Sequence, residues 1–162
     1  MKRAVILIAS MLLCFSTGAQ VRNHRLGIGG VVLHERGLEA DLVWEMETND
    51  HNAWEVFANG YLKWQDGKIS FTDDYYSWGI GAAYRPCVVR RRNNYGSMRF
   101  GASAGCDRSD FLAGLHIGYE HDYALPHGWM LYWQAKFAVM LPKREDLIRA
   151  GVGIGVKLPL SR

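Results

Sequence analysis

The segment DLIRAGVGIGVKL, from Asp146 to Leu158, sorts its residues by parity. The even positions from 148 to 158 are all apolar, whereas the odd positions from 149 to 157 hold only glycine, arginine and lysine. Because successive side chains of a β-strand point to opposite faces, this pattern predicts a strand with one apolar face and one face of glycine and cations. A narrow barrel with a crowded polar lumen and a lipid-facing wall requires both kinds of face.

The rest of the chain repeats this alternation in runs separated by Gly, Asp, Asn and Pro clusters. We predict eight strands, near residues 25–33, 37–47, 52–64, 74–85, 95–105, 110–123, 128–140 and 146–158. The connections are short, which indicates hairpins and an antiparallel meander. The predicted fold class is therefore all-β, an eight-stranded antiparallel up-and-down transmembrane β-barrel after a cleaved signal peptide.

The N-terminal end has the composition of a secretory signal. Lys2 and Arg3 precede an apolar stretch, residues 4–15, and a small-residue cleavage site follows at residues 17–19. About twelve apolar residues are too few to span a bilayer of ~30 Å, which favours a signal peptide over a membrane anchor. We predict a signal peptide at 1–19 and a single β-barrel domain at 20–162.

Composition excludes several classes of protein. Removing Lys2 and Arg3 with the signal peptide lowers the formal charge from +3 to +1, and no basic stretch is interleaved with aromatics, so we expect no nucleic acid partner. No later segment holds 18 apolar residues in a row, which excludes a helical membrane protein.

Cys87 and Cys106 bracket one predicted strand and so fall at opposite mouths of the barrel. A disulfide needs Cα atoms within ~7 Å, and we therefore predict two free thiols.

The inward face is predicted to carry both signs of charge, which fill the lumen as paired buried groups. This predicted polar network comprises Glu39, Asp41, Glu45, Glu55, Lys63, Arg85, Arg99, His116, Glu120, Gln134, Lys136, Arg149 and Lys157. The outward face is predicted to carry an aromatic girdle at each membrane interface. The girdle residues are Trp44, Trp54, Trp64, Tyr76, Trp78, Tyr84, Tyr119, Trp129 and Trp133.

A soluble lipocalin-like barrel in the periplasm would show the same alternation, with its apolar face lining a ligand cavity. Two observations favour the membrane barrel. Repeated glycine weakens a water-facing strand but suits a tight lumen. Trp54 and Trp64 lie ten residues apart on one face, which a strand tilted by ~40° projects to roughly 25 Å, the height of the apolar band.

In architecture, residues Leu26 to Leu158 resemble the small eight-stranded outer-membrane proteins, the group that includes OmpX and the OmpA transmembrane domain. The signal ending Gly18-Ala19-Gln20 resembles those of exported Bacteroidota proteins. Tyr76 to Arg85 and the closing Arg149 to Leu158 are similar to TraO-type proteins of conjugative transposons. The first resemblance implies an outer membrane location. The last implies an exported component of a DNA-transfer apparatus, with no catalytic residues to carry over.

Three groups of residues resemble sites that could carry chemistry. If the second and third strands pair around residues 48–51, Glu45 and Glu55 face each other and one would serve as an acid, but we expect them near the mouth, where water screens them. His116 and His121 superficially resemble a zinc-protease motif, yet a strand sends them to opposite faces. A lipid A-modifying enzyme needs a rim Ser and His, for which His121 and Ser109 are the best pair.

Two glycine runs, residues 27–30 and 151–155, are not followed by a helix and do not predict a nucleotide loop. Arg90-Arg91-Arg92 falls in the predicted connection 86–94, as a solvated turn or as a contact for anionic head groups or an acidic partner.

We expect no catalytic residue, no metal and no cofactor. The expected function is a non-enzymatic structural or interaction component of the outer membrane, in contact with lipid and other envelope proteins. The alternatives are a lipid A-modifying enzyme and a periplasmic ligand-binding barrel.

Overall fold

The computed structural model describes residues 23–34, 36–48, 51–64, 75–107, 110–141 and 147–160. The predicted signal peptide, residues 1–19, lies outside them. The strands are β1 (Asn23–Leu33), β2 (Gly37–Glu47), β3 (Ala53–Lys63), β4 (Tyr75–Arg85), β5 (Cys87–Arg90), β6 (Asn94–Asp107), β7 (Phe111–Ala124), β8 (Met130–Leu141) and β9 (Ile148–Pro159), with a short 3-10 turn at Pro126–Gly128.

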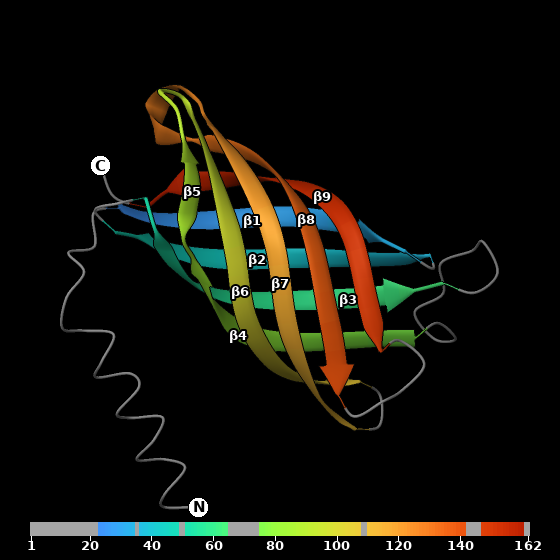
Figure 1. Cartoon of the computed structure of the whole chain (residues 1–162). Helices are drawn as coiled ribbons and strands as arrows, with labels where there is room; N and C mark the ends of the chain where they lie inside the picture. The colour runs from blue at the N-terminus through green and yellow to red at the C-terminus, as the bar shows by residue number, and fades with distance from the viewer. Residues whose placement is uncertain are drawn as a thin grey trace, which may run out of the picture.

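All neighbouring strands are antiparallel and follow the chain order. β1 also pairs with β9, and β4 pairs with β6, so the sheet closes on itself (Figure 1). β5 continues β4 beyond Pro86, so these two segments count as one strand of the barrel wall. The nine strand segments therefore form a closed eight-stranded up-and-down barrel. The predicted all-β fold, an eight-stranded antiparallel up-and-down barrel, is confirmed. Within the described residues, no helix is long and apolar enough to cross a membrane.

The strand β5 corrects the prediction that residues 86–94 form only a connection. Pro86 interrupts the ladder because it has no N–H, but its carbonyl still accepts a hydrogen bond from Met98 N at 3.1 Å. Beyond this bend Cys87 pairs with Ser97, and a bulge shifts the register before Arg90. Arg90 therefore ends a strand, and only the residues after it form the turn.

β5 and the adjoining ends of β6, β7 and β8 stand above the rest of the barrel (Figure 1). β3 begins at Ala53, opposite Arg85, so β5 has no β3 partner. We call residues 87–97 together with residues 119–131 the extension. It lies at the same end as the start of β1, the end of β9 and the β2–β3 turn, because each antiparallel hairpin returns the chain to this end.

The barrel is apolar outside and charged inside. Val152 and Ile154 of β9 are 64 % and 70 % exposed, whereas Arg149 and Lys157 of the same strand are buried. The other strands alternate in the same sense. The parity rule read from residues 146–158 therefore holds around the barrel. Small apolar clusters, such as Val43 with Phe57 and Ala83, pack between the inward charges.

Close packing of a ring on the inner face of neighbouring strands explains two of the inward glycines. The Tyr132 ring from β8 is buried, and a Cβ added at Gly29 or Gly155 would collide with it. Lys157 Nζ lies over the same ring, 5.1 Å from its centroid. Gly60, by contrast, points outward, and a Cβ there would meet nothing within 4 Å.

Candidate functional site

The lumen brings together almost the whole predicted polar network. Lys63, at the end of β3, is only half-buried. The other twelve residues are buried inside the barrel. They come from β2, β3, β4, β6, β7, β8 and β9, so the network connects strands that are not neighbours in the sheet.

Arg85, the last residue of β4, lies at the centre of the charges at the extension end. Its Nη1 is 2.7 Å from Glu45 Oε2 and 3.1 Å from Glu55 Oε1. The same nitrogen donates to Glu120, and Nη2 donates to Asp122 Oδ2 at 2.8 Å. Four carboxylates from three strands thus converge on one buried guanidinium, whose planar array of N–H groups suits such multiple contacts.

Further cations share these carboxylates. Arg99 Nε donates to Glu55 Oε2 at 2.7 Å, and Lys157 Nζ lies 2.5 Å from Glu45 Oε2. Arg25 Nη1 donates to Glu45 Oε1 at 2.8 Å. The Lys157 ammonium also contacts two carboxylates of β7. Each buried carboxylate therefore has a cationic partner, which offsets the cost of removing its charge from water.

Lys136 of β8 organises a second group of charges, nearer the opposite mouth. Its Nζ donates to Glu39 Oε1 and lies 3.3 Å from Asp41 Oδ1. Asn59 Nδ2 donates to Glu39 at 3.2 Å, and Gln134 Nε2 donates to Asp41 at 3.4 Å. Since β1 and β9 separate β2 from β8 in the sheet, these contacts cross the lumen.

Aromatic rings lie among the two groups of charges. Arg99 Cζ is 4.5 Å from the centroid of the Phe57 ring, and Arg149 Cζ is 3.8 Å from that of Tyr61. Both rings are buried on the inward face of β3. A cation over a ring face is attracted by the quadrupole of the ring, so the aromatics hold charge as well as fill volume.

Three charged members of the network were missed by sequence reasoning. Arg25, Glu47 and Asp122 are buried and ion-paired at the extension end. Each has the inward parity of its strand: Asp122 follows Glu120 by two residues, and Glu47 follows Glu45. All three are found when the alternation of inward and outward residues is followed to the ends of each strand.

The expected facing of Glu45 and Glu55 is confirmed, because the β2–β3 ladder sets them directly opposite. The expected screening by water is wrong, since the side chains are 1 % and 2 % exposed. Ligand oxygens of Glu45, Glu55 and Glu120 lie within 4.8 Å of one another, a spacing that suits a metal ion. Arg85 and Lys157 already contact this triad, and their positive charges oppose a bound cation.

Ser103 and His116 form a pair that sequence reasoning did not find. Ser103 Oγ is 2.6 Å from His116 Nε2 inside the lumen. The β6–β7 register sets Gly101 opposite His116, so Ser103 is its diagonal neighbour. Among the described residues His116 Nδ1 has no hydrogen-bond partner, whereas a catalytic triad needs a third group to orient the imidazole. The pair therefore fits a structural role.

His116 and His121 of β7 lie on opposite faces, as predicted. His121 points outward, where its Nδ1 is 2.9 Å from Tyr119 Oη and its ring stacks on Trp133 at 6.1 Å. Its proposed rim partner Ser109 lies outside the described residues. His121 is thus part of an aromatic cluster on the outer wall.

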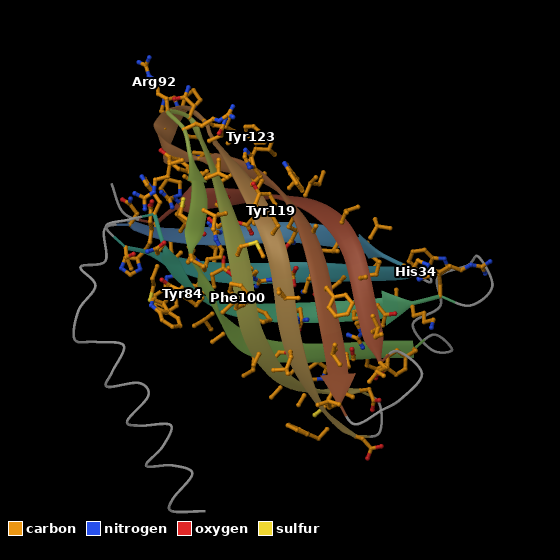
Figure 2. The ribbon with its side chains drawn as sticks, viewed as in Figure 1. His34, Tyr84, Arg92, Phe100, Tyr119 and Tyr123 are labelled. Carbon is orange, nitrogen blue, oxygen red and sulfur yellow. The ribbon has the colours of Figure 1, made fainter. Side chains whose placement is uncertain are left out.

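The predicted girdle aromatics fall toward the two ends of the barrel. Toward the extension lie Trp44, Trp54, Tyr84, Tyr119, Trp129 and Trp133. Trp54 and Tyr84 are register partners with ring centroids 4.7 Å apart. Trp64, Tyr76 and Trp78 lie toward the opposite mouth. Figure 2 shows Tyr84 and Tyr119 on the half toward the extension and His34 at the other end.

A small cavity lies near each mouth of the barrel. At the extension end His51 Nδ1 lies 2.5 Å from Glu47 Oε1, and its ring stacks on Tyr95 at 4.3 Å. The adjacent cavity has a volume of about 10 Å³. A cavity lined by Ser77 and Arg149 near the other mouth has a similar volume, about 10 Å³. Each has room for about one water molecule.

Cys87 and Cys106 are both free. Cys87 pairs with Ser97 in the extension, whereas Cys106 pairs with Trp78 near the opposite end of β6. The predicted separation of the two thiols is confirmed.

Comparisons with known proteins identify the architecture. No family model matches the chain, and no curated protein matches it. A de novo designed transmembrane β-barrel is 8% identical, with 88% of this chain and 100% of the designed chain covered and a TM-score of 0.53. The Yersinia pestis outer membrane protein Ail, in a phospholipid bilayer nanodisc, is 12% identical, with 86% and 100% covered and a TM-score of 0.53. The likeness shows the fold, a barrel of the transmembrane type.

Proposed function

We propose that this chain is a non-enzymatic outer-membrane β-barrel that acts as a structural or interaction component of the cell envelope. One observation carries the proposal: charged residues are buried and large apolar residues are exposed over the whole barrel wall. A soluble protein rarely exposes a contiguous apolar patch larger than a few hundred Å². A closed barrel with this distribution suits a lipid environment, because the ring of paired strands leaves no open sheet edge along the wall below β5.

Detergent dependence tests the membrane location. We expect the full chain to fractionate with outer membranes and to aggregate when detergent is withdrawn. A monodisperse monomer in plain buffer would contradict the proposal and favour the soluble ligand-binding barrel. The charged lumen argues against that alternative, since a lipocalin-like barrel lines its interior with apolar side chains.

The filled lumen supports a role that does not involve solute passage. The Arg85 and Lys136 groups cross the interior, and the cavities at the two mouths are of about 10 Å³ each. We therefore expect no stepwise conductance when the chain is inserted into a planar bilayer, with a water-filled porin measured in parallel. Reproducible steps of defined size would refute the sealed lumen.

The lipid A-modifying enzyme remains the competing function, and lipid A itself provides the test. We expect the mass spectrum of lipid A to be unchanged when the protein is expressed. Loss or gain of an acyl chain would replace the proposed function with an enzymatic one.

For the partner, we infer an envelope protein of a conjugative transfer apparatus. The support is the sequence similarity of Tyr76–Arg85 and Arg149–Leu158 to TraO-type proteins. Deletion of the gene is then expected to lower transfer frequency, and in-cell crosslinking should recover a transfer protein. An unchanged transfer frequency, with intact expression of the neighbouring genes, would refute this partner. It would not affect the proposal that the chain is an outer-membrane barrel.

A further inference from the structure

The outer face of the extension is apolar up to its tip. Val88 of β5 and Tyr123 of β7 are exposed there, and Leu125 and Trp129 of the β7–β8 turn are 43 % and 47 % exposed. Figure 2 places Tyr119 and Tyr123 in succession along β7 toward Arg92. Tryptophan and tyrosine are enriched where a protein crosses from lipid to water. The face therefore continues the lipid-facing wall into the interfacial region.

The tip above this face is cationic. Arg90 ends β5, and Arg91 and Arg92 follow it as exposed residues of the turn. Arg91 N donates to Asn94 O at 2.9 Å, and Ala124 N donates to Asn93 O at 2.8 Å, which joins this turn to the β7–β8 turn. Residues 86–98 and 123–141, which supply both turns, contain no Asp or Glu. The two turns therefore contribute positive charge and no negative charge of their own.

We propose that the tip of the extension binds the phosphate of an anionic phospholipid in the leaflet on the side of the chain termini. Arg90, Arg91 and Arg92 supply the charge, and Leu125 and Trp129 rest against the apolar part of the lipid. Guanidinium groups bind phosphate oxygens in a bidentate manner, and basic residues at a membrane surface are attracted by anionic lipid. The inference rests on the proposed membrane location and adds a ligand to it.

An acidic protein is the competing partner, and the outer face decides against it. A water-borne acidic surface would neutralise the arginines but leave the apolar face beside them uncovered. A phospholipid satisfies both, because phosphate and acyl chain are parts of one molecule.

The experiment uses the full chain in neutral detergent micelles, titrated with short-chain phosphatidylglycerol and, separately, phosphatidylcholine. Binding is followed by the NMR shifts of the Trp129 indole N–H and the arginine Nε–H groups. The test variant is Arg90→Ser/Arg91→Ser/Arg92→Ser, and Arg90→Lys/Arg91→Lys/Arg92→Lys retains the charge. Arg36→Asn, in the β1–β2 turn at the opposite mouth, is the matched control, since Asn tolerates the φ of 63° found there.

We expect saturable shifts with phosphatidylglycerol alone, and an apparent Kd weakened at least about tenfold by the serine variant. The lysine variant and Arg36→Asn should stay close to the wild-type Kd. Equal Kd values for wild type and the serine variant, or equal binding of both lipids, would overturn the inference. Shifts produced by a poly-glutamate peptide but not by phosphatidylglycerol would overturn it in favour of an acidic protein. Neither result affects the detergent dependence that tests the membrane location.

Discussion

Glu45 and Glu55 stand directly opposite each other in the β2–β3 ladder, and the Arg85 guanidinium from β4 contacts both, at 2.7 and 3.1 Å. Like charges in a register pair are destabilising unless a counter-charge is present. The ladder that forms the barrel wall thus creates an electrostatic conflict, and a side chain from the next strand resolves it. The charges of the lumen are for this reason part of the fold.

Replacing Arg85 with Met should therefore destabilise the barrel strongly. The substitution leaves four carboxylates without their shared cation, and breaking a buried ion pair costs about 3–5 kcal/mol. Urea unfolding in lipid vesicles measures the loss in free energy of unfolding. Arg92→Ser, at the exposed tip, is the matched control and should stay within about 0.5 kcal/mol of wild type. Equal unfolding free energies of the two variants would show that the ion pairs of Arg85 do not stabilise the barrel.

Gly155→Ala should destabilise the barrel by roughly 1–3 kcal/mol, because the added Cβ would collide with the Tyr132 ring. Gly60→Ala makes the same chemical change on the outer face, where the Cβ meets nothing. It is expected to be neutral or slightly stabilising, since alanine loses less backbone entropy than glycine on folding. The same urea titration compares the two variants. A similar loss of unfolding free energy in both variants would mean that Gly155 is not required for the packing of Tyr132 in the lumen.

Cysteine labelling tests which face meets lipid. In a Cys87→Ser/Cys106→Ser background, Val152→Cys and Ile154→Cys should resist a water-soluble maleimide in intact outer membranes, although both sites are exposed on the isolated chain. Arg92→Cys should react readily in the same membranes when the inner leaflet is accessible. Rapid labelling at residues 152 and 154 would show that the outer wall is in water.

The mature chain should titrate as two free thiols without reductant. Cys87 and Cys106 lie toward opposite ends of the barrel, and Cys14 would leave with the predicted signal peptide. Thiol quantification in denaturant, together with N-terminal sequencing that begins at Gln20, checks both expectations. A third thiol would show that the signal peptide is retained, and a zero count would indicate a bond that the strand order forbids.

Local sequence predicted the strands well because the period of two is a property of each strand alone. The parity of residues 146–158 placed Val152 outward and Lys157 inward before any partner was known. The same rule, stopped too early, missed Asp122 and Glu47. It also treated Arg90 as part of a loop, since Pro86 ends a strand in sequence terms but here only bends one.

Contacts across the lumen lay beyond the sequence. Lys136 with Asp41 and the packing of Tyr132 against Gly29 depend on barrel closure, which parity does not encode. The contact of Ser103 with His116 depends on the register of the β6–β7 hairpin, which parity does not encode either. Burial of Glu45 and Glu55 has the same origin, since only the far wall of the barrel excludes water from them.

The sequence by itself determined the faces of the strands and the order of the hairpins, because side-chain alternation and turn composition act over a few residues. The tertiary structure alone decided which charges meet, how completely the lumen is filled and where an extension rises above one mouth. Those features follow from the closed ring, which brings residues from strands far apart in the chain within hydrogen-bond distance.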